Sequence, residues 1–513
     1  MNLTVVENPK LNKVYSGRRT IYTDYEEVTF DNVLEIIEDT LSQHYANFVE
    51  IAQLRAFEKN NQPILRRKKD VRPEINYKIC ENHAHEIKEF KKGYVFGQPI
   101  TYVQRAGNDS TKSDEKKDDK GIDTLNQFMF EQSKSVKDLR LAEDFTICGI
   151  ANRIVLPNKN PDEESPFKIV NLDPCFSYVV RARNIERTKI LGVSFNIDKK
   201  GYMTIGAYSD KLYFEIGRDK DNNLECLSIS PNGIGAIPIV EYENDINRMG
   251  SFEVVIPLLN AINLATSDRI NGLAQFIQSF IWFNNIQLND GDLGKLKDNG
   301  AIVTKDLNEQ SKASIQYLVS QLNQTEVQTL VNDLYDQVLK IAGVPKSEKS
   351  SGGNTGQAII FSDGWQIAET QAQCSEIIFN EGEKEMLAVC KKIIDKTNKK
   401  VPEELKNLKV SDIEIKFNRD RTDSMLVKTQ GLTNMLNAGI HPRIAIKTCG
   451  LFCDPQQVWA DSAEYLEKWV YEHSSNEDSL EDEEKTDNFE KEETENENIT
   501  NGENNLPKDI KDE

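Results

Sequence analysis

One segment, residues 252–283, constrains the fold of this 513-residue chain more than any other. Its apolar residues recur at three- and four-residue steps, which predicts one long helix, with Pro257 tolerated near the start. Its 32 residues would span about 48 Å at about 1.5 Å per residue. A helix this apolar is buried from several sides, either within one chain or against neighbouring copies. The stripe consists of Val255, Leu258, Leu259, Ile262, Ile270, Leu273, Phe276, Ile277, Phe280 and Ile281.

The residues before this helix predict an α+β domain. Helical spacing covers three segments, residues 31–58, 76–92 and 125–147. Asp31 is a candidate N-cap for the first helix, and Gly93 is expected to stop the second. Residues 94–103 are expected to form a short strand-like hairpin. From residue 153 to 242, β-branched and aromatic runs alternate with turn signals, as is typical of a sheet.

The chain after residue 284 predicts a different, mostly helical organisation. Residues 284–314 form a short segment punctuated by Gly and Asp, and we expect it to hold small strands. A helix is expected over 324–342, stopped by Gly343 and Pro345, and a polar glycine-rich loop follows. Helical patterning resumes over 358–396, although Gly364 predicts a kink or break within it. The remaining predicted elements are a strand over 410–417 and helices over 423–437 and 455–471.

The charge of the chain is uneven. Its net charge is −21, and residues 474–513 hold 16 Asp and Glu against 4 Lys, a net of −12. The body therefore carries −9, which argues against a regulator that grips duplex DNA through a basic face. A conduit is compatible with this charge, because a wall that neutralised many phosphates would hold the DNA. We expect the acidic tail to be disordered; it could keep the protein soluble, recruit a basic partner or repel DNA.

Localisation signals are absent from the sequence pattern. No window of 18 apolar residues predicts a transmembrane helix, and the first residues do not resemble a secretory signal. Eight cysteines are scattered without a framework of spacings, so we expect reduced thiols in a cytoplasmic setting.

Four segments together resemble the portal proteins of long-tailed phages that infect Gram-positive bacteria. Residues 93–102 read Gly-Tyr-Val-Phe-Gly-Gln-Pro-Ile-Thr-Tyr, and residues 259–271 resemble the start of that family's first stem helix. Residues 352–359, Gly-Gly-Asn-Thr-Gly-Gln-Ala-Ile, are similar to a segment that opens a long helix in the family. Residues 415–420 resemble the strand before its helical crown. The charged insert at 105–121 departs from the family pattern.

The resemblance implies the portal fold, assembled into a cyclic ring of about twelve subunits. Implied partners are the terminase large subunit, the head–tail connector, scaffolding and major capsid proteins, and double-stranded DNA that passes through without sequence recognition. The implied location is the portal vertex of the virion, with assembly in the host cytoplasm and no membrane. The implied regions are an α+β wing (1–250), a first stem helix (251–283), a clip (284–318), a second stem helix (319–343), a tunnel loop (344–356), a long helix with a wing strand (357–421), a helical crown (422–473) and a disordered acidic tail (474–513).

Two sets of site residues follow from this resemblance. The tunnel loop would contact DNA, because glycines let backbone amides approach phosphate and lysines add a screened attraction. Without the resemblance, a flexible helix connector is the preferred interpretation of this loop. The clip would contact the terminase or the connector. The tunnel-loop residues are Lys346, Lys349, Ser350, Gly352, Gly353, Asn354 and Thr355, and the clip residues are Asp290, Asp292, Lys295 and Lys297.

Catalytic and metal-binding patterns are not supported, and no cofactor is expected. The glycine loop lacks the terminal Gly-Lys-Ser/Thr of a nucleotide-binding loop, so the packaging ATPase should be another protein. Cys80, His83 and His85 do not share one helical face, and the pair Cys449 and Cys453 offers too few ligands for zinc. The segment that begins at Asp290 resembles the start of a calcium loop, but it lacks the glycine at the sixth position and the glutamate at the twelfth. The alternatives are a scaffold or capsid component, which the β-rich region disfavours, and a DNA-processing enzyme.

Overall fold

The polypeptide divides into two units, residues 1–420 and 421–513, in the computed structural model. Helices and sheets occur together, as the α+β prediction requires. The structure describes residues 17–70, 72–105, 119–218, 223–277, 280–284, 314–318, 324–346, 364–418, 425–452, 458, 459, 461, 462 and 465.

The larger sheet of the first unit has six strands in the order β1-β5-β6-β7-β8-β9. Strands β5 to β9 pair antiparallel with their neighbours in sequence, whereas β1 joins the edge parallel to β5. Helix α1 (Val33–Glu58) packs on this sheet and shares a hydrophobic core with it. The strands are β1 (Ile21–Thr23), β5 (Ser177–Ala182), β6 (Lys189–Ile197), β7 (Met203–Tyr208), β8 (Leu212–Arg218) and β9 (Leu224–Pro231).

Alternation along the strands explains which face α1 covers. In β7, Met203, Ile205 and Ala207 are buried while the residues between them are more exposed. These side chains meet Ile36 and Ile37 of α1 in one core. A strand with one apolar face requires such a cover, because successive side chains point to opposite faces of the sheet.

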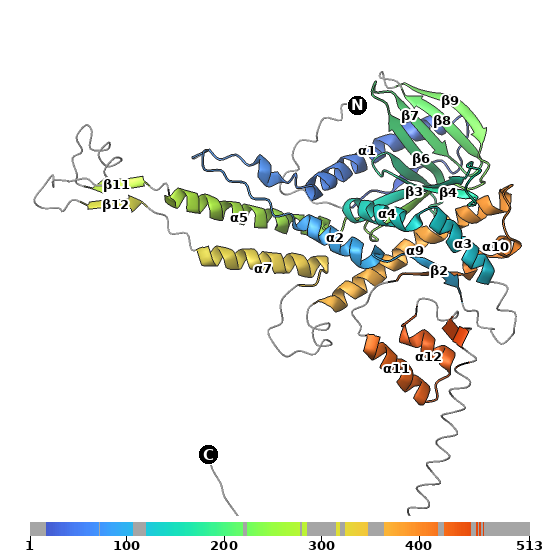
Figure 1. Ribbon diagram of the computed structural model, residues 1–513. Coiled ribbons are helices and arrows are strands. Elements are labelled where there is room, and N and C mark those ends of the chain that lie inside the picture. The colour runs from blue at the N-terminus through green and yellow to red at the C-terminus, as the bar shows by residue number, and fades with distance from the viewer. Residues whose placement is uncertain are drawn as a thin grey trace, which may run out of the picture. The chain divides into compact units, whose positions relative to one another are not determined.

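A second sheet, in the order β10-β3-β4, lies at the centre of the largest core (Figure 1). Helices α2, α3, α4 and α9 contribute side chains to that core, as does the antiparallel pair of β13 and β2. The bounds are α2 (His83–Phe96), β2 (Thr101–Gln104), α3 (Asp119–Glu131), α4 (Lys134–Cys148), β3 (Ile150–Pro157), β4 (Phe167–Leu172), β10 (Ile239–Glu243), α9 (Trp365–Lys396), α10 (Glu403–Asn407) and β13 (Ile413–Lys416).

Buried charges tie α9 to the rest of this core. Glu383 of α9 lies 3.3 Å from Arg153 of β3 and 3.2 Å from Lys134 of α4. Asp138 completes the network at 2.7 Å from Arg153 and 2.6 Å from Lys134. Two cations thus face two carboxylates, all at least 95% buried, so the desolvated charges are balanced.

Two tyrosines and one glycine complete the contact of α9 with the sheets. The hydroxyls of Tyr102 and Tyr242 donate to Glu383 at 2.6 and 3.0 Å. Burial, and then the negative charge of Glu383, raise the pKa of both phenols, so they remain donors. Gly382 lets the helix approach, since a Cβ there would lie 2.7 Å from the Tyr242 ring.

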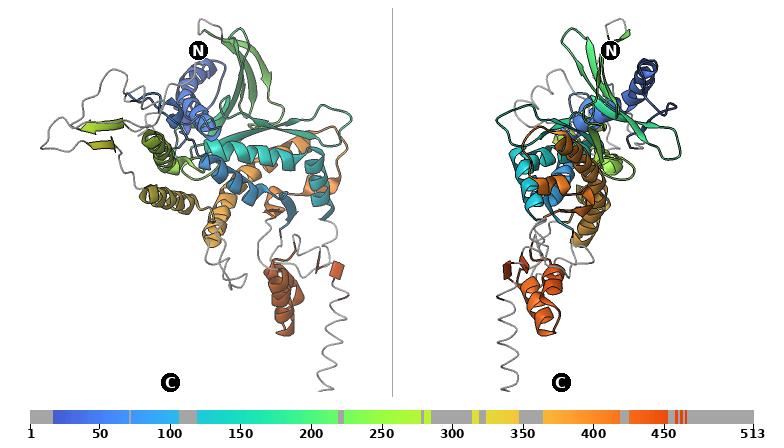
Figure 2. Two further views of the ribbon diagram at one scale, coloured as in Figure 1. Left: turned by 60° about the vertical axis from the view of Figure 1, so that its left-hand side comes forward. Right: turned by 90° about the vertical axis from the view of Figure 1, so that its right-hand side faces the viewer.

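A pair of helices, α5 (Ile256–Ile277) and α7 (Gln324–Ala342), leads away from the core region (Figure 1). Next to the ends of these helices, β11 (Phe280–Asn284) pairs antiparallel with β12 (Ser314–Leu318). The left view of Figure 2 shows α5 and α7 from a further side. Short 3₁₀ helices lie at η1 (Pro63–Arg66), η2 (Glu253–Val255) and η3 (Val410–Asp412).

The described part of the second unit holds α11 (Met425–Asn437) and α12 (Pro442–Cys449). His441 caps α12, because its Nδ1 accepts the Arg443 backbone N–H at 3.2 Å, and Pro442 occupies the first turn. The predicted helix over 423–437 is therefore confirmed from Met425, whereas α12 was not predicted. Of the predicted helix over 455–471, the structure describes residues 458, 459, 461, 462 and 465, which are helical, and the acidic tail lies outside the described residues.

The predictions for residues 76–103 were wrong at the helix ends and in the hairpin. Helix α2 begins at His83 and continues through Gly93 to Phe96. The preceding residues are extended, because side chains of α5 bind their backbone. No hairpin forms among these described residues, since β2 pairs instead with β13, about 310 residues later in the sequence. Contacts this distant in sequence cannot be inferred from local patterning.

The single helix predicted over 252–283 was also wrong. Helix α5 ends at Ile277, and the aromatic run from Phe280 forms β11. Aromatic residues favour strands, and pairing with β12 supplies the hydrogen bonds. By contrast, the helix predicted over 324–342 is confirmed.

Local chemistry accounts for other differences between the predicted and the observed ends of helices and strands. Ser133, with φ of +50°, separates α3 from α4 where one helix was predicted. Gly364, with φ of +82°, precedes the start of α9 at Trp365, and residues 358–363 lie outside the described residues. Asn32 rather than Asp31 precedes α1, and its side chain binds the backbone of Thr29. The predicted strand over 410–417 begins only at Ile413.

Candidate functional site

The pair of helices α5 and α7 forms the frame of the candidate site. In the halves nearest the two-sheet body of the first unit, Ile256, Leu259 and Ile262 of α5 share a core with Val338 and Leu339 of α7. Full burial of one such side chain stabilises the fold by about 1.5–3 kcal/mol, so this half is firmly attached to the body.

Outside this shared core, several apolar side chains of α5 and α7 are exposed. Leu273 of α5 and Leu330 of α7 are 54% and 52% exposed, and Leu264 and Ile341 are almost as open. Leu330 and Ile341 lie on one face of α7, because eleven residues correspond to about three helical turns. Single exposed leucines are ordinary, but two apolar side chains on one face of α7, Leu330 and Ile341, mark a surface that another chain can cover.

A polar ladder on α5 holds the chain that precedes α2. Asn263, Ser267 and Asn271 follow one another at four-residue steps and are at least 98% buried. Their side-chain oxygens accept the backbone N–H groups of Glu81, Ile79 and Tyr77 at 2.8, 2.9 and 2.7 Å. Ser267 and Asn271 also donate to the carbonyls of Ile79 and Tyr77 at 3.3 and 3.1 Å.

The ladder works because two spacings match. Four helical residues rise about 6 Å, and two extended residues advance about 6.6 Å. Side chains on one helix face therefore meet alternate residues of an extended chain, which satisfies backbone groups that have no sheet partner. The sequence carried the signal, three short polar residues four apart within an apolar stripe, but sequence reasoning had treated them as part of the helix only.

Arg269 joins the outer parts of α5 and α7. Its Nε donates to the side-chain oxygen of Gln324 at 3.0 Å, and its Nη1 donates to that of Gln328. The guanidinium thus donates charge-assisted hydrogen bonds to two neutral side-chain amides of the facing helix. These bonds fix the register of the helix pair.

The loop predicted to contact DNA begins at the end of α7. Gly343 has φ of +64°, and a Cβ there would lie 2.1 Å from the side chain of Gln371, so this turn requires glycine. Lys346 Nζ lies 3.0 Å from Asp336 Oδ2, and both side chains are exposed. The structure thus places Lys346 next to α7. The other predicted loop residues, Lys349, Ser350, Gly352, Gly353, Asn354 and Thr355, lie outside the described residues.

The residues predicted for the clip also lie outside the described part of the chain. Asp290, Asp292, Lys295 and Lys297 fall between β11 and β12. The register of these strands runs from Phe280 opposite Leu318 to Asn284 opposite Ser314. The described residues that flank 285–313, Asn284 and Ser314, therefore lie opposite each other in the strand pair.

Helix α2 contacts α7 through a histidine that sequence reasoning had considered only as a metal ligand. The rings of His83 and Tyr335 lie 4.4 Å apart, and the Tyr335 hydroxyl donates to Glu86 at 2.7 Å. His83 also binds Glu86 and Glu81 at 2.9 and 3.2 Å. Burial lowers the pKa of His83, but the hydrogen bonds to these carboxylates outweigh it, and the pKa is raised.

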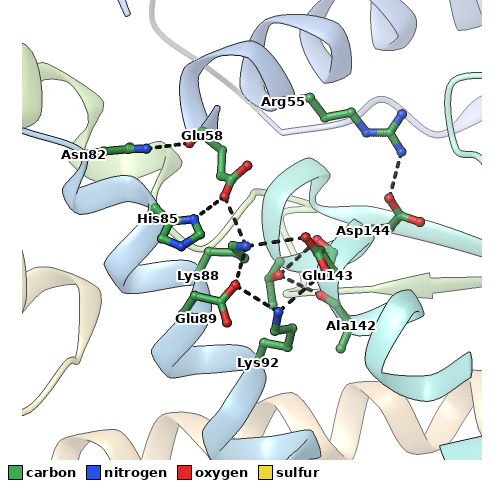
Figure 3. Close-up of polar contacts among 11 residues, drawn as sticks. Arg55, Glu58, Asn82, His85, Lys88, Glu89, Lys92, Ala142, Glu143 and Asp144 are labelled. Carbon is green, nitrogen blue, oxygen red and sulfur yellow. Dashed lines mark hydrogen bonds and ion pairs between the residues drawn. The ribbon is translucent and has the colours of Figure 1, made fainter. Parts of the chain in front are cut away.

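A charged cluster fixes α2 to α1 and α4 (Figure 3). Lys88 of α2 is 98% buried, and its amine lies 3.1 Å from Glu58, 2.5 Å from Glu89 and 3.4 Å from Glu143. Lys92 contacts Glu89 and Glu143 from the next turn. The hydrogen bond from Lys88 holds the pKa of Glu89 at about 2, so this carboxylate stays charged. Through α2, the cluster connects α7 to the body.

Neither a metal site nor a membrane span emerges among the described residues. Within the described ranges, histidine, cysteine and acidic side chains form no group of three that could hold a metal ion. His83 and His85 bind carboxylates instead, and Cys453 lies outside those ranges. No helix among the residues placed by the structure is long and apolar enough to cross a membrane.

Comparison with known proteins identifies a family for this chain. A family model described as phage portal protein, SPP1 Gp6-like, matches residues 20–497. This range contains every helix and strand listed above. No curated protein matches the sequence.

Proposed function

The chain belongs to the SPP1 Gp6-like family of phage portal proteins, and from this membership we propose how its parts serve DNA packaging. The family is structural, and its members act at the capsid vertex through which phage DNA is packaged. The carrying observation is the extent of the match, which runs through the body, the helix pair and the second unit.

We propose that about twelve copies close into a ring with cyclic symmetry around a channel. In this arrangement α5 and α7 form the stem, residues 284–318 the clip and residues 422–473 the crown. The exposed leucines on α5 and α7 support such packing, because a ring would bury them against the next subunit.

For the two predicted contact regions, we propose the following roles. The clip residues Asp290, Asp292, Lys295 and Lys297 contact the terminase large subunit during packaging and the head–tail connector afterwards. The loop that starts at Lys346 touches DNA transiently. Lys346 and its neighbour Lys349 supply screened attraction that lets the duplex slide. Scaffolding and major capsid proteins would surround the ring during assembly in the host cytoplasm.

Electron microscopy of the purified full chain, with its solution mass, tests the ring. Rings of about a dozen subunits with a central channel are the expected result. A monomer or dimer at every salt concentration and in the presence of capsid and scaffolding proteins would contradict it.

A loop variant tests the proposed contact with DNA. Shortening the glycine-rich part of the loop, while Gly343 and Lys346 are retained, should preserve rings and reduce the length of DNA packaged. Full-length genomes packaged at the normal rate would remove the loop from the mechanism. The pair Lys199→Gln and Lys200→Gln, in the exposed β6–β7 turn, is the matched control.

A further inference from the structure

The connection between α1 and α2 carries an unusual charge for this chain. Residues 65–78 contain six lysines and arginines against two acidic residues, a net charge of +4. The rest of the chain therefore carries −25, since −21 minus +4 is −25. We call residues 65–70 and 72–78 the basic loop. Its cations are Arg66, Arg67, Lys68, Lys69, Arg72 and Lys78.

The two arms of the basic loop are bound to each other. Lys78 Nζ donates to the Leu65 carbonyl at 2.7 Å, and the side chain of Asn76 donates to the Arg67 carbonyl at 3.1 Å. Lys69 Nζ donates to the Ile75 carbonyl at 3.2 Å. These crossed contacts bring cations from both arms into one area.

The basic loop is also fixed to α5, along which it runs in Figure 1. The ladder of Asn263, Ser267 and Asn271 holds the arm that enters α2. Arg67 of the other arm pairs with Asp268 of α5 at 2.6 Å. The loop thus presents its outward cations in a defined arrangement, so a ligand need not order them first.

The outward surface is cationic. Arg66, Lys68 and Lys78 are exposed, while Arg67 and Lys69 are partly covered by the contacts above. Asp70 and Glu74 are the acidic residues on the loop, and Arg72 offsets Glu74 at 3.5 Å. Beneath the loop, α5 adds one acidic and one basic residue, Asp268 and Arg269. The net charge of this area therefore remains +4.

We infer that the basic loop binds the phosphate backbone of duplex DNA, as a contact separate from the glycine-rich loop after α7. Lysine is depleted at the centre of protein interfaces but is a usual phosphate ligand. The inference rests on the proposed function, in which duplex DNA passes the ring. The acidic remainder of the protein would keep this contact weak and sensitive to salt, as a sliding duplex requires.

The test measures binding of a short fluorescein-labelled DNA duplex to the full chain by anisotropy, over a series of salt concentrations. The test variant is Lys68→Gln with Lys69→Gln, and the matched control is Lys199→Gln with Lys200→Gln. The slope of log K against log salt should become shallower by about 1.8 in the test variant, at about 0.9 per phosphate contact. The control should keep the wild-type slope.

Additional measurements separate the possible outcomes. Lys68→Gln alone should change the slope by about 0.9. This single variant keeps the contact of Lys69 with the Ile75 carbonyl, so its slope cannot be explained by a disturbed loop. Unchanged hydrogen exchange at the Tyr77 and Ile79 amides would show that the loop remains docked. Equal slopes for test and control, or no DNA binding at low salt, would overturn the inference. A third outcome would favour an acidic protein partner and overturn the inference. In that outcome, the wild type binds polyglutamate, the test variant does not, and both bind DNA equally.

Failure of this inference differs from failure of the proposed function. Rings seen by electron microscopy together with an unchanged salt slope would remove the basic loop and leave the portal assignment intact. Absence of rings would challenge the proposed assembly, whatever the salt slope.

Discussion

The centre of the body and the pair of helices α5 and α7 both bury polar side chains, but they satisfy these side chains in different ways. In the body, Glu383 and Arg153 are fully buried, yet their charges are balanced inside one chain. On the helix pair, the buried polar residues bind backbone, and apolar residues such as Leu273 remain exposed. The charges at the centre of the body are balanced within a single chain, whereas the helix pair leaves apolar side chains exposed along its length. The ring proposed above would use both kinds of region.

The largest effect is expected from breaking the charge balance of the body. Glu383→Ala leaves Arg153 and Lys134 with one carboxylate between them, and loss of a buried partner typically costs about 3–5 kcal/mol. Urea unfolding should show this loss of free energy. The control Glu381→Ala removes an exposed carboxylate from the same helix and should cost below about 0.5 kcal/mol. Similar losses for both variants would mean that the network does not hold the body together.

The next effect concerns the ladder on α5. Asn271→Ala removes the partner of both backbone groups of Tyr77 and should cost about 1–3 kcal/mol locally. Hydrogen exchange should accelerate at the Tyr77 amide and leave the amides of β3 unchanged. Thr329→Ala, an exposed site on α7, is the control. Equal acceleration in β3 would show that helix pair and body unfold as one unit, and so would erase the contrast between them.

A smaller, pH-dependent effect is expected where α2 meets α7. The raised pKa of His83 means that its contribution is complete below the ordinary histidine value of 6.5 and is lost as pH rises through the raised value. Glu86 has a lowered pKa, chiefly from its hydrogen bond with His83, so its contribution is complete above 4.5 and is lost on acidification. The contact should therefore be strongest between pH 4.5 and 6.5.

The pH-dependent contribution of the contact between His83 and Glu86 should be at most about 1 kcal/mol, because both side chains are partly exposed. Urea midpoints measured across this range for the wild type and for His83→Gln would show it. The wild type should lose stability relative to the variant as pH rises from 6.5 through the raised pKa of His83. Parallel pH profiles would mean that the contact of α2 with α7 is insensitive to His83 protonation.

The smallest effect on folding, and the clearest on assembly, is expected at the exposed leucines. Leu273→Ser and Leu330→Ser should change the free energy of unfolding by less than about 0.5 kcal/mol, since neither side chain is buried. Solution mass should nevertheless show fewer rings. Normal ring formation in the double variant would indicate that this surface is not a subunit interface.

One helix of the frame of the site lay within reach of sequence reasoning, for a local reason. The helix over 324–342 and the turn at Gly343 follow from apolar spacing and from the need for a positive φ. The resemblance to portal proteins, drawn from four segments, agrees with a family match over residues 20–497. The polar ladder and the basic loop were missed. Their residues are ordinary one by one and acquire a role only when residues 77–81 meet residues 263–271.

What the sequence alone determined is the α+β class, the portal resemblance and the positions of elements whose signals are local. Tertiary structure decided the elements whose partners are distant. The aromatic run at 280–284 became a strand because β12 pairs with it, and residues 77–81 stayed extended because α5 binds their backbone. The pairing of β2 with β13 crosses about 310 residues, which no local pattern encodes. Hydrogen-bond partners and buried charges are properties of the folded chain, so these features could be seen only once it was folded.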